Sequence, residues 1–398
     1  MNLKVNVAAL VAIIAVFFCV SNINLVKAAE LDTLATDSVK AKRNLRFSML
    51  GGPGYSPDFG FLIGGSALFT FSTNPADTAL KRSVVPVAFA YMANGGGSAI
   101  IRPQLFFNHD RFRIFGQISA KNTIENYYGI GYANNSEIEK GETTTEYRNI
   151  GYRFNPVLLF RYKKTDLFLG GSIDISQQNI TEPSQGVMND PVYIAQGGDS
   201  TGLKFFNVGL GVNFNYDTRD VPANAYSGML LEFSATYYSK SFGGESDYGV
   251  YNFNYRQFKE LKFLGERKVL AWMLKGQFTS GDVPLTEYAP IGSPFDLRGY
   301  YMGQYRDSNS MAGVVEYRHM FNMGDETWLR RLGSKMGFAA WCGLGSIGPD
   351  MSNWSPLLPN YGVGIRIEVQ PRMNFRMDIG KDPINNQTLL YFNMTEAF

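Results

Sequence analysis

The sequence YGVGIRIEVQPRMNFRMDI, residues 361–379, alternates between apolar and polar side chains along two consecutive segments. The apolar set is Tyr361, Val363, Ile365, Ile367, Val369, Met373, Phe375, Met377 and Ile379. Successive side chains of a β-strand point to opposite faces, so each segment predicts a strand with one apolar and one polar face. The polar face carries charges of both signs, which favours the wet interior of a membrane barrel with lipid on the apolar side.

Similar alternating segments recur along almost the whole chain, at about 44–53, 60–73, 82–93, 97–108, 111–120, 147–162, 165–178, 203–217, 228–240, 248–261, 266–279, 310–321, 335–346, 360–370, 373–381 and 388–398. Each is close to the ~10 residues that a tilted membrane strand needs. Pro86 and Pro103 weaken the early segments, because proline donates no hydrogen bond to a ladder. We therefore expect an all-β fold, a single transmembrane antiparallel barrel of about 16 strands.

The lengths of the connections give an independent signal. The long connections, about 121–146, 179–202, 280–309 and 346–359, follow the fifth, seventh, eleventh and thirteenth segments. Several connections after even-numbered segments are tight, such as Lys163-Lys164 and Pro371-Arg372. Outer-membrane barrels have short periplasmic turns and long outer loops, so this parity predicts a barrel whose N-terminus lies in the periplasm.

The first residues predict export. Lys4 precedes an apolar run from Ala8 to Val20 that is too short to span a bilayer, and Val26-Lys27-Ala28 offers compact residues for cleavage. We expect a signal peptide at 1–28, a short periplasmic segment at 29–43, a barrel at 44–398 and a location in the bacterial outer membrane. Cys342 is then the only cysteine left, which excludes an internal disulfide. The net charge of +2 predicts no nucleic-acid partner.

Catalytic chemistry has little support in this sequence. His109 and His319 are the only histidines, and neither lies near a nucleophile and an acid in the chain. The sequence contains no phosphate-binding loop and no zinc-ligand spacing. We therefore expect no enzyme activity, no cofactor and no metal.

The 280–309 connection contains the stretch GSPFDLRGY, residues 292–300. A loop of this length in a compact fold is usually functional or disordered. Phe295, Leu297 and Tyr300 supply apolar anchors, and Gly299 separates Tyr300 from Arg298. The guanidinium group of Arg298 is a planar fork of donors suited to a buried carboxylate, so these residues fit an ordered loop with a buried arginine. Taken alone, they fit a surface loop with one solvated arginine equally well.

Several segments resemble the BamA/TamA family of outer-membrane barrels, the bacterial surface antigen superfamily. They are Gly51 to Phe71, the stretch NYYGIG at 126–131, Phe295 to Tyr300 with Val315 to Arg318, and Gly362 to Asp378. Asp217, Arg219 and Asp220, followed by Gly228, are similar to the family's periplasmic-turn motif. The C-terminal residue Phe398, with Leu390, Phe392 and Met394 before it, resembles the signal that outer-membrane assembly machinery reads; Glu396 departs from it.

The resemblance implies that the loop between strands 11 and 12 folds into the lumen and that Arg298 pairs with acids on neighbouring strands. Glu316 corresponds to the first acid, and it shares the polar face of its strand with Arg318. The position of the family's second acid holds Gly343 here. We therefore expect Glu316 to carry more of the interaction, with Glu368 or Asp378 as the second acceptor.

By resemblance, the expected function is to assist insertion or translocation of polypeptides at the outer membrane, through a weak seam between the first and last strands. The partners would be membrane lipid and unfolded outer-membrane proteins or a lipoprotein. Family members usually carry periplasmic POTRA domains of about 75 residues, and Ala29 to Leu45 leaves room for none. That departure favours the alternative, a porin-like or structural barrel that passes small solutes or anchors a lipoprotein.

Overall fold

The computed structural model describes residues 44–78, 80–324 and 326–398; the predicted signal peptide at 1–28 and the segment at 29–43 lie outside these residues. The strands are β1 Arg46–Ser56, β2 Gly60–Phe71, β3 Ser83–Met92, β4 Gly97–Ile101, β5 Gln104–Phe107, β6 Phe112–Asn126, β7 Glu146–Arg161, β8 Leu167–Thr181, β9 Leu203–Asp217, β10 Gly228–Tyr238, β11 Tyr248–Glu260, β12 Lys268–Gly281, β13 Ala289–Ile291, β14 Tyr305–Asp307, β15 Asn309–Met320, β16 Met336–Gly348, β17 Leu358–Gln370, β18 Met373–Asp382 and β19 Gln387–Met394. The helices are α2 Tyr132–Glu137, α3 Gln185–Met188, α4 Pro191–Ala195 and α5 Trp328–Ser334, with 3-10 turns η1 Lys240–Phe242 and η2 Lys262–Leu264. None of the helices that the described residues form is long and apolar enough to cross a membrane.

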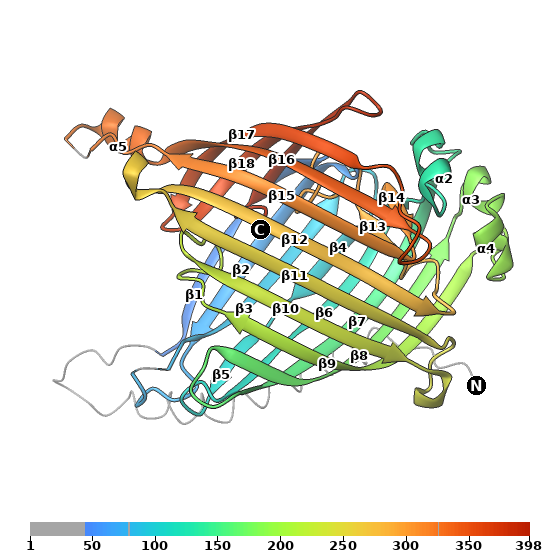
Figure 1. Cartoon of the computed structure of the whole chain (residues 1–398), viewed down its shortest axis with the longest axis horizontal. Helices are drawn as coiled ribbons and strands as arrows, with labels where there is room; N and C mark the ends of the chain where they lie inside the picture. The colour runs from blue at the N-terminus through green and yellow to red at the C-terminus, as the bar shows by residue number, and fades with distance from the viewer. Residues whose placement is uncertain (1–43, 79, 325) are drawn as a thin grey trace. The chain divides into compact units, whose positions relative to one another are not determined.

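The strands of the large sheet pair antiparallel with their neighbours along the chain, from β1 with β2 to β18 with β19 (Figure 1). β4 and β5 both pair with β3 and with β6, so they are two halves of one strand interrupted at Arg102 and Pro103. Counted in this way, the described residues form the sixteen strands that alternation predicts. Pro103 breaks its strand, whereas Pro86 stays within β3 opposite Leu68.

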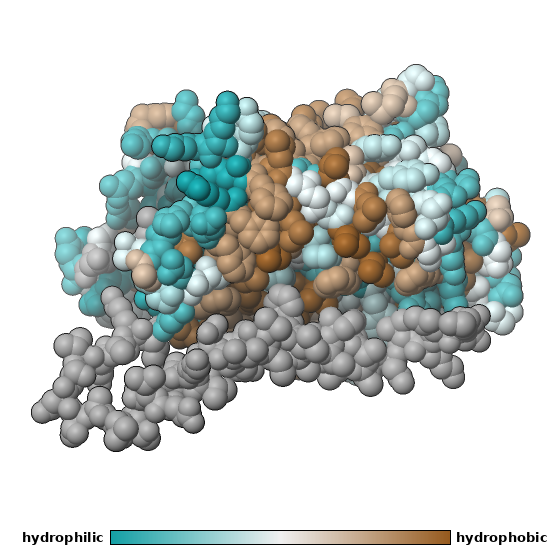
Figure 2. Space-filling view, turned by 90° about the horizontal axis from the view of Figure 1, so that it is seen from below, coloured by the Kyte–Doolittle hydropathy of each residue, from teal (hydrophilic) through white to brown (hydrophobic). Residues whose placement is uncertain are grey.

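The two faces of the sheet differ in chemistry as the alternation predicts. Large apolar side chains such as Ile63, Val363 and Ile379 are exposed on the outer face, and Val363 is 60% exposed. Their polar neighbours Arg366 and Asp378 are fully buried on the inner face. Figure 2 shows hydrophobic residues gathered in a band across the middle of the surface, with hydrophilic residues toward both ends. Such a band suits contact with the hydrocarbon of a bilayer.

The long connections meet at one end of the sheet, as their parity predicts. Figure 1 shows α2, α3 and α4 at that end and α5 at the opposite end. The N–H of Gly131 donates to the carbonyl of Arg306 at 2.9 Å, and the side chain of Gln196 donates to the carbonyl of Val283 at 2.9 Å. The loops after β6 and β8 are therefore joined to the loop after β12.

The first and last strands of the sheet approach each other at the side chains of Tyr55 and Phe392, whose ring centroids lie 6.3 Å apart. Among the described residues, the registered ladders join β1 only to β2 and β19 only to β18. Among the described residues, β1 and β19 thus approach without a registered backbone ladder, while every other neighbouring pair in the sheet has one.

Candidate functional site

The loop between β12 and β15 is organised by its own short hairpin. β13 and β14 pair antiparallel, with Ala289 opposite Asp307. The N–H of Gly303 donates to the carbonyl of Gly292 at 2.8 Å. Gly292 has a φ of 102°, and a Cβ there would lie 2.2 Å from the carbonyl oxygen of Tyr301. Only glycine fits this position without moving the backbone.

Two of the three expected apolar anchors hold the loop inside the sheet. Leu297 and Tyr300 are fully buried in a core shared with the strand wall, and the hydroxyl of Tyr300 donates to the carbonyl of Pro359 at 2.8 Å. Phe295 is 48% exposed and lies beside Arg376, whose guanidinium carbon is 5.4 Å from its ring centroid. Phe295 therefore partly covers the side chain of Arg376 and is not a core residue.

Arg298, at the centre of the loop, is fully buried and contacts four strands of the wall. Its Nη1 donates to Oδ2 of Asp378 at 2.8 Å, and its Nη2 donates to Oε2 of Glu316. Its guanidinium carbon lies 3.5 Å from the centroid of the Trp341 ring, a close cation–π contact. The side-chain amide of Asn360 donates to its carbonyl at 2.8 Å. The loop therefore reaches β15, β16, β17 and β18 through one residue.

Further charges surround this pair, so that four arginines share three carboxylates. The members are Arg298, Arg318, Arg366, Arg376, Glu316, Asp378 and Glu396, and all are buried. Asp378 also accepts from Arg366 at 2.6 Å and from Arg376, while Glu316 accepts from Arg318 at 2.8 Å. Burying charges is costly unless each is paired and hydrogen-bonded, and here each carboxylate meets at least two arginines.

The register of β17 and β18 explains why this group of charges assembles. Arg366 lies directly opposite Arg376, an arrangement of like charges that is unfavourable by itself. Asp378 compensates, because it follows Arg376 on the same face and binds both arginines. Gly364 is the residue opposite Asp378, and a Cβ there would lie 2.0 Å from Oδ1 of Asp378. The glycine leaves room for the carboxylate.

The glycine at position 343 has a structural reason as well. A Cβ on Gly343 would lie 2.5 Å from Oδ1 of Asn360, the residue whose amide holds the carbonyl of Arg298. Asn360 therefore occupies the space where the resemblance places an acid. The second carboxylate comes instead from Asp378, one of the two acceptors expected for that role.

Glu368, the other expected acceptor, does not contact Arg298. Its Oε2 accepts from Nη2 of Arg267 at 2.7 Å, at the end of the sheet opposite the long loops. Gly364, the partner of Asp378, lies four residues earlier on β17, which corresponds to about 13 Å along a strand. Glu368 lies on the polar face of its strand, as predicted. Its position along the strand is wrong for the role of acceptor to Arg298.

The expected periplasmic-turn residues form a compact hydrogen-bonded turn between β9 and β10. Asp217 accepts from Nε and Nη2 of Arg219, both at 2.9 Å, and Gly228 has a φ of 92°. Asp220 accepts from Nη2 of Arg372 at 2.5 Å and from backbone N–H groups of its own turn. Partial burial raises the pKa of Asp220, but these hydrogen bonds outweigh burial and hold it below its ordinary value of 3.8.

The C-terminal residues depart from the predicted strand at 388–398. β19 ends at Met394, and Thr395, with a φ of 68°, turns the chain inward. Phe398 is 7% exposed; its ring lies 6.5 Å from that of Phe258, and its carbonyl accepts from Arg318 at 2.9 Å. The expected alternation holds for the strand residues Leu390, Phe392 and Met394. The expectation that Phe398 continues their face is wrong, and its role as an assembly signal stays a prediction.

The sequence also held signals for residues that the prediction of the site did not include. Glu396 interrupts the terminal apolar alternation, and it receives Nε of Arg366 at 2.8 Å and the amide of Asn374 at 2.7 Å. Trp341 shares the inner face of β16 with three glycines, an arrangement that leaves its ring open to a partner from the loop. A polar residue in an apolar pattern, and a tryptophan beside glycines, were the available signals.

A cavity of 310 Å³ lies beside the loop, between the wall and the β13–β14 hairpin. Its charged lining residues carry both signs: Lys121 binds Glu125 at 2.5 Å, Lys275 binds Asp296, and Asp58 and Arg306 add one charge of each sign. Balanced charges of this kind do not select a ligand of one sign. Within 44–78, 80–324 and 326–398, no group of acids, histidines or cysteines is arranged to hold a metal ion.

Comparison with solved structures shows what the fold is similar to. BamA from Haemophilus ducreyi lacking POTRA domains 1-3 is 11% identical over 89% of this chain and 71% of that one, with a TM-score of 0.58. CdiB from Acinetobacter baumannii is 13% identical over 89% of this chain, with a TM-score of 0.52. CdiB from Escherichia coli is 11% identical over 90%, with a TM-score of 0.56. This chain spans 60% and 63% of the two CdiB chains.

The family comparison covers most of the barrel. No curated protein sequence matches the chain. Residues 95–393, from before β4 to within β19, match the model of the Omp85 superfamily domain. The matched region includes the loop with Arg298 and the strands that carry Glu316 and Asp378. The chain therefore belongs to the Omp85 superfamily.

Proposed function

We propose that this protein is a barrel of the outer membrane that assists the insertion or translocation of polypeptides there. Superfamily membership supports the location, and the apolar band of the outer face supports contact with lipid. One local observation carries the function: among the described residues, no registered backbone ladder joins β1 to β19. The clients would be unfolded outer-membrane proteins, and a lipoprotein would be a partner at the periplasmic end.

The sequence of β1 explains why this junction is weak. Gly51, Gly52 and Pro53 are consecutive, so the strand has two residues without side chains to pack and one without an N–H to donate. Beyond them, the ring of Tyr55 meets that of Phe392. A strand edge with free N–H and C=O groups is a template for another strand. A client strand would pair with these edges as it enters the bilayer.

The buried charges around Arg298 argue against a wide pore along the neighbouring strands. Arg298, Glu316 and Asp378 are fully buried, so they do not line an open channel. A porin needs charged side chains that face a water-filled path. The loop instead fills the interior against β15 to β18, which supports a role at the seam over passive passage of solutes.

A reversible crosslink across the seam tests the proposal. Tyr55→Cys and Phe392→Cys would be joined with a cleavable thiol reagent, after Cys19→Ser and Cys342→Ser remove the native cysteines. The protein is placed in vesicles, and folding of a urea-unfolded outer-membrane barrel is followed by its heat-modifiable migration on gels. The unlinked protein should accelerate folding, the crosslink should abolish the acceleration, and cleavage should restore it.

The matched control joins two strands far from the seam. Val363 and Ile379 lie opposite each other on β17 and β18, and both are exposed on the outer face. A crosslink between cysteines at these positions should leave the acceleration unchanged. Equal loss with both crosslinks, or no acceleration by the unlinked protein, would refute the proposal. Steady ion conductance across planar bilayers without any effect on folding would support the porin-like alternative.

A further inference from the structure

The segment between β15 and β16 carries apolar side chains that no part of the described chain covers. Trp328, Leu329 and Leu332 of α5 are 69%, 60% and 50% exposed. At about 100° per residue, these positions fall on one side of the helix, while Arg330 and Arg331 fall on the other. The helix is therefore amphipathic, although its apolar side faces outward.

The position of α5 is fixed by contacts with a neighbouring turn and with the end of β17. Arg267, in the turn between β11 and β12, donates from Nη1 to the carbonyl of Ser334 at 2.7 Å and from Nη2 to Glu368 at 2.7 Å. The N–H of Glu368 donates to the carbonyl of Lys335 at 2.7 Å. The hydroxyl of Thr327 caps the helix by accepting from the N–H of Arg330 at 3.3 Å. These hydrogen bonds hold α5 in place with its apolar side exposed.

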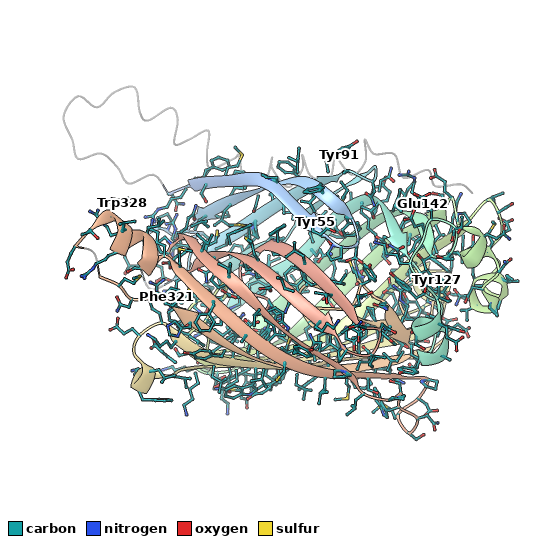
Figure 3. The ribbon with its side chains drawn as sticks, turned by 90° about the horizontal axis from the view of Figure 1, so that it is seen from above. Tyr55, Tyr91, Tyr127, Glu142, Phe321 and Trp328 are labelled. Carbon is teal, nitrogen blue, oxygen red and sulfur yellow. The ribbon has the colours of Figure 1, made fainter. Side chains whose placement is uncertain are left out.

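The apolar side of α5 continues the outer face of the sheet. The ring of Phe338, on β16, stacks on His319 at 5.0 Å and lies 6.1 Å from that of Phe321, and both phenylalanines are more than a third exposed. Figure 3 shows Trp328 and Phe321 at the same end of the sheet. Phe263, on the neighbouring η2, is 82% exposed. These residues extend the apolar band past the ends of the strands.

The charges beside this surface are mostly positive. Lys262, Arg331 and Lys335 flank the apolar side chains, and Arg330 is paired with Glu326. Glu266 is a further acid in the adjacent turn. A second copy of the chain would present the same positive surface, which disfavours self-association through this face. Apolar side chains with tryptophan and flanking basic residues are the composition that binds the headgroup region of a bilayer.

We propose that α5 and η2 lie in the headgroup layer of the periplasmic leaflet, where they bind a phospholipid surface that contains anionic lipid. The side chains of Trp328, Leu329, Leu332 and Phe263 would enter the boundary between headgroups and acyl chains. Arg331, Lys335 and Lys262 would meet lipid phosphates. This contact anchors the end of the barrel that carries the short turns, and it is independent of any effect on client folding.

Quenching of tryptophan fluorescence by brominated lipids tests the depth of α5. The full chain is reconstituted in vesicles of phosphatidylcholine with added phosphatidylglycerol, and the signal of Trp328 is taken as the difference from a Trp328→Phe variant. Bromines placed close to the headgroup should quench this signal more strongly than bromines near the end of the acyl chain. A Trp328 signal that no brominated lipid quenches would overturn the proposal.

A fluorophore on position 329 tests the role of charge and the identity of the occupant. Leu329→Cys, with Cys19→Ser and Cys342→Ser, is labelled with an environment-sensitive dye. Its emission should shift to the blue when anionic lipid is added, and the shift should fall at high salt or with Arg331→Glu and Lys335→Glu. The matched control is Ile194→Cys on α4, which is 55% exposed at the opposite end and should show no such shift. No dependence on anionic lipid, or dimers linked through position 329, would overturn the proposal.

Discussion

Nη1 of Arg298 donates to Oδ2 of Asp378 at 2.8 Å, although 80 residues separate them along the chain. Neither side chain is exposed to solvent. When one partner of a buried ion pair is removed, the other charge remains without compensation, and this is the main cost of such a substitution. The contacts of Arg298 therefore make strong and specific predictions about the loop.

Arg298→Ala and Glu316→Gln should each lower the free energy of unfolding by about 3–5 kcal/mol, because each leaves buried charge unpaired. The double variant should lose less than the sum of the single losses, as expected for side chains in contact. Urea unfolding in detergent measures the stability, and limited proteolysis measures the release of the loop. Strict additivity would show that the two residues do not act as a pair.

Gly299→Ala should displace the loop without removing any charge. Gly299 has a φ of 122°, and a Cβ there would lie 2.7 Å from the carbonyl carbon of Lys381. Gly95→Ala is the control: its φ of 92° is equally unsuited to alanine, but the space around it is open. The control should cost only about 1–2 kcal/mol. Protease cleavage within 282–304 should increase for Gly299→Ala alone.

A pair of neighbouring residues on β11 tests which face meets lipid. Phe253 lies opposite Phe233 on the outer face, whereas Asn252 is exposed and donates to Ser234 on the inner face. Phe253→Arg should cost about 2–4 kcal/mol near the middle of the bilayer, because it places a charge in hydrocarbon. Asn252→Arg should cost much less. Equal losses of stability in vesicles would contradict the assignment of faces.

Phe398→Ala should destabilise the folded barrel through lost packing. Its ring is buried near Phe258 and Arg318, so the substitution leaves a cavity and should cost about 3–5 kcal/mol. Leu390→Ala is the control, since Leu390 is 37% exposed on the outer face and should cost less. Unfolding in detergent, without assembly machinery, separates this packing effect from any role as an assembly signal. An unchanged unfolding midpoint for Phe398→Ala would contradict the buried position.

The turn after β9 should loosen in acid. The pKa of Asp220 is lower in the folded protein than its ordinary value of 3.8, so its hydrogen bonds contribute stability above that value. That contribution is lost as the pH falls through the folded pKa. Pepsin cleavage of the turn should therefore rise as the pH decreases below 3.8. The Asp220→Asn substitution should abolish this rise in cleavage. An equal rise in cleavage of the variant would show that another titratable group causes it.

Alternation predicted the faces of the strands well, because a strand has a period of two whatever it packs against. The sequence could place Glu316, Glu368 and Asp378 on the inner face, but it could not rank Asp378 above Glu368. That choice depends on height in the barrel, which register and stagger between strands determine. The inward turn at Thr395 was hidden for a related reason, since it is stabilised by Arg318 and Glu396, which meet only in the folded barrel.

One arginine spans a considerable width of the wall. Arg298 joins Glu316 on β15 to Asp378 on β18, across three strand spacings of about 4.8 Å, or roughly 14 Å. Strands β15 to β18 therefore form a rigid part of the wall, which resists bending between its two edges. Any change in the shape of the barrel must then occur outside these four strands. The junction between β19 and β1 lies next to them. The buried charges around Arg298 thus concentrate deformation of the barrel at the seam between β1 and β19, although they are not part of that seam.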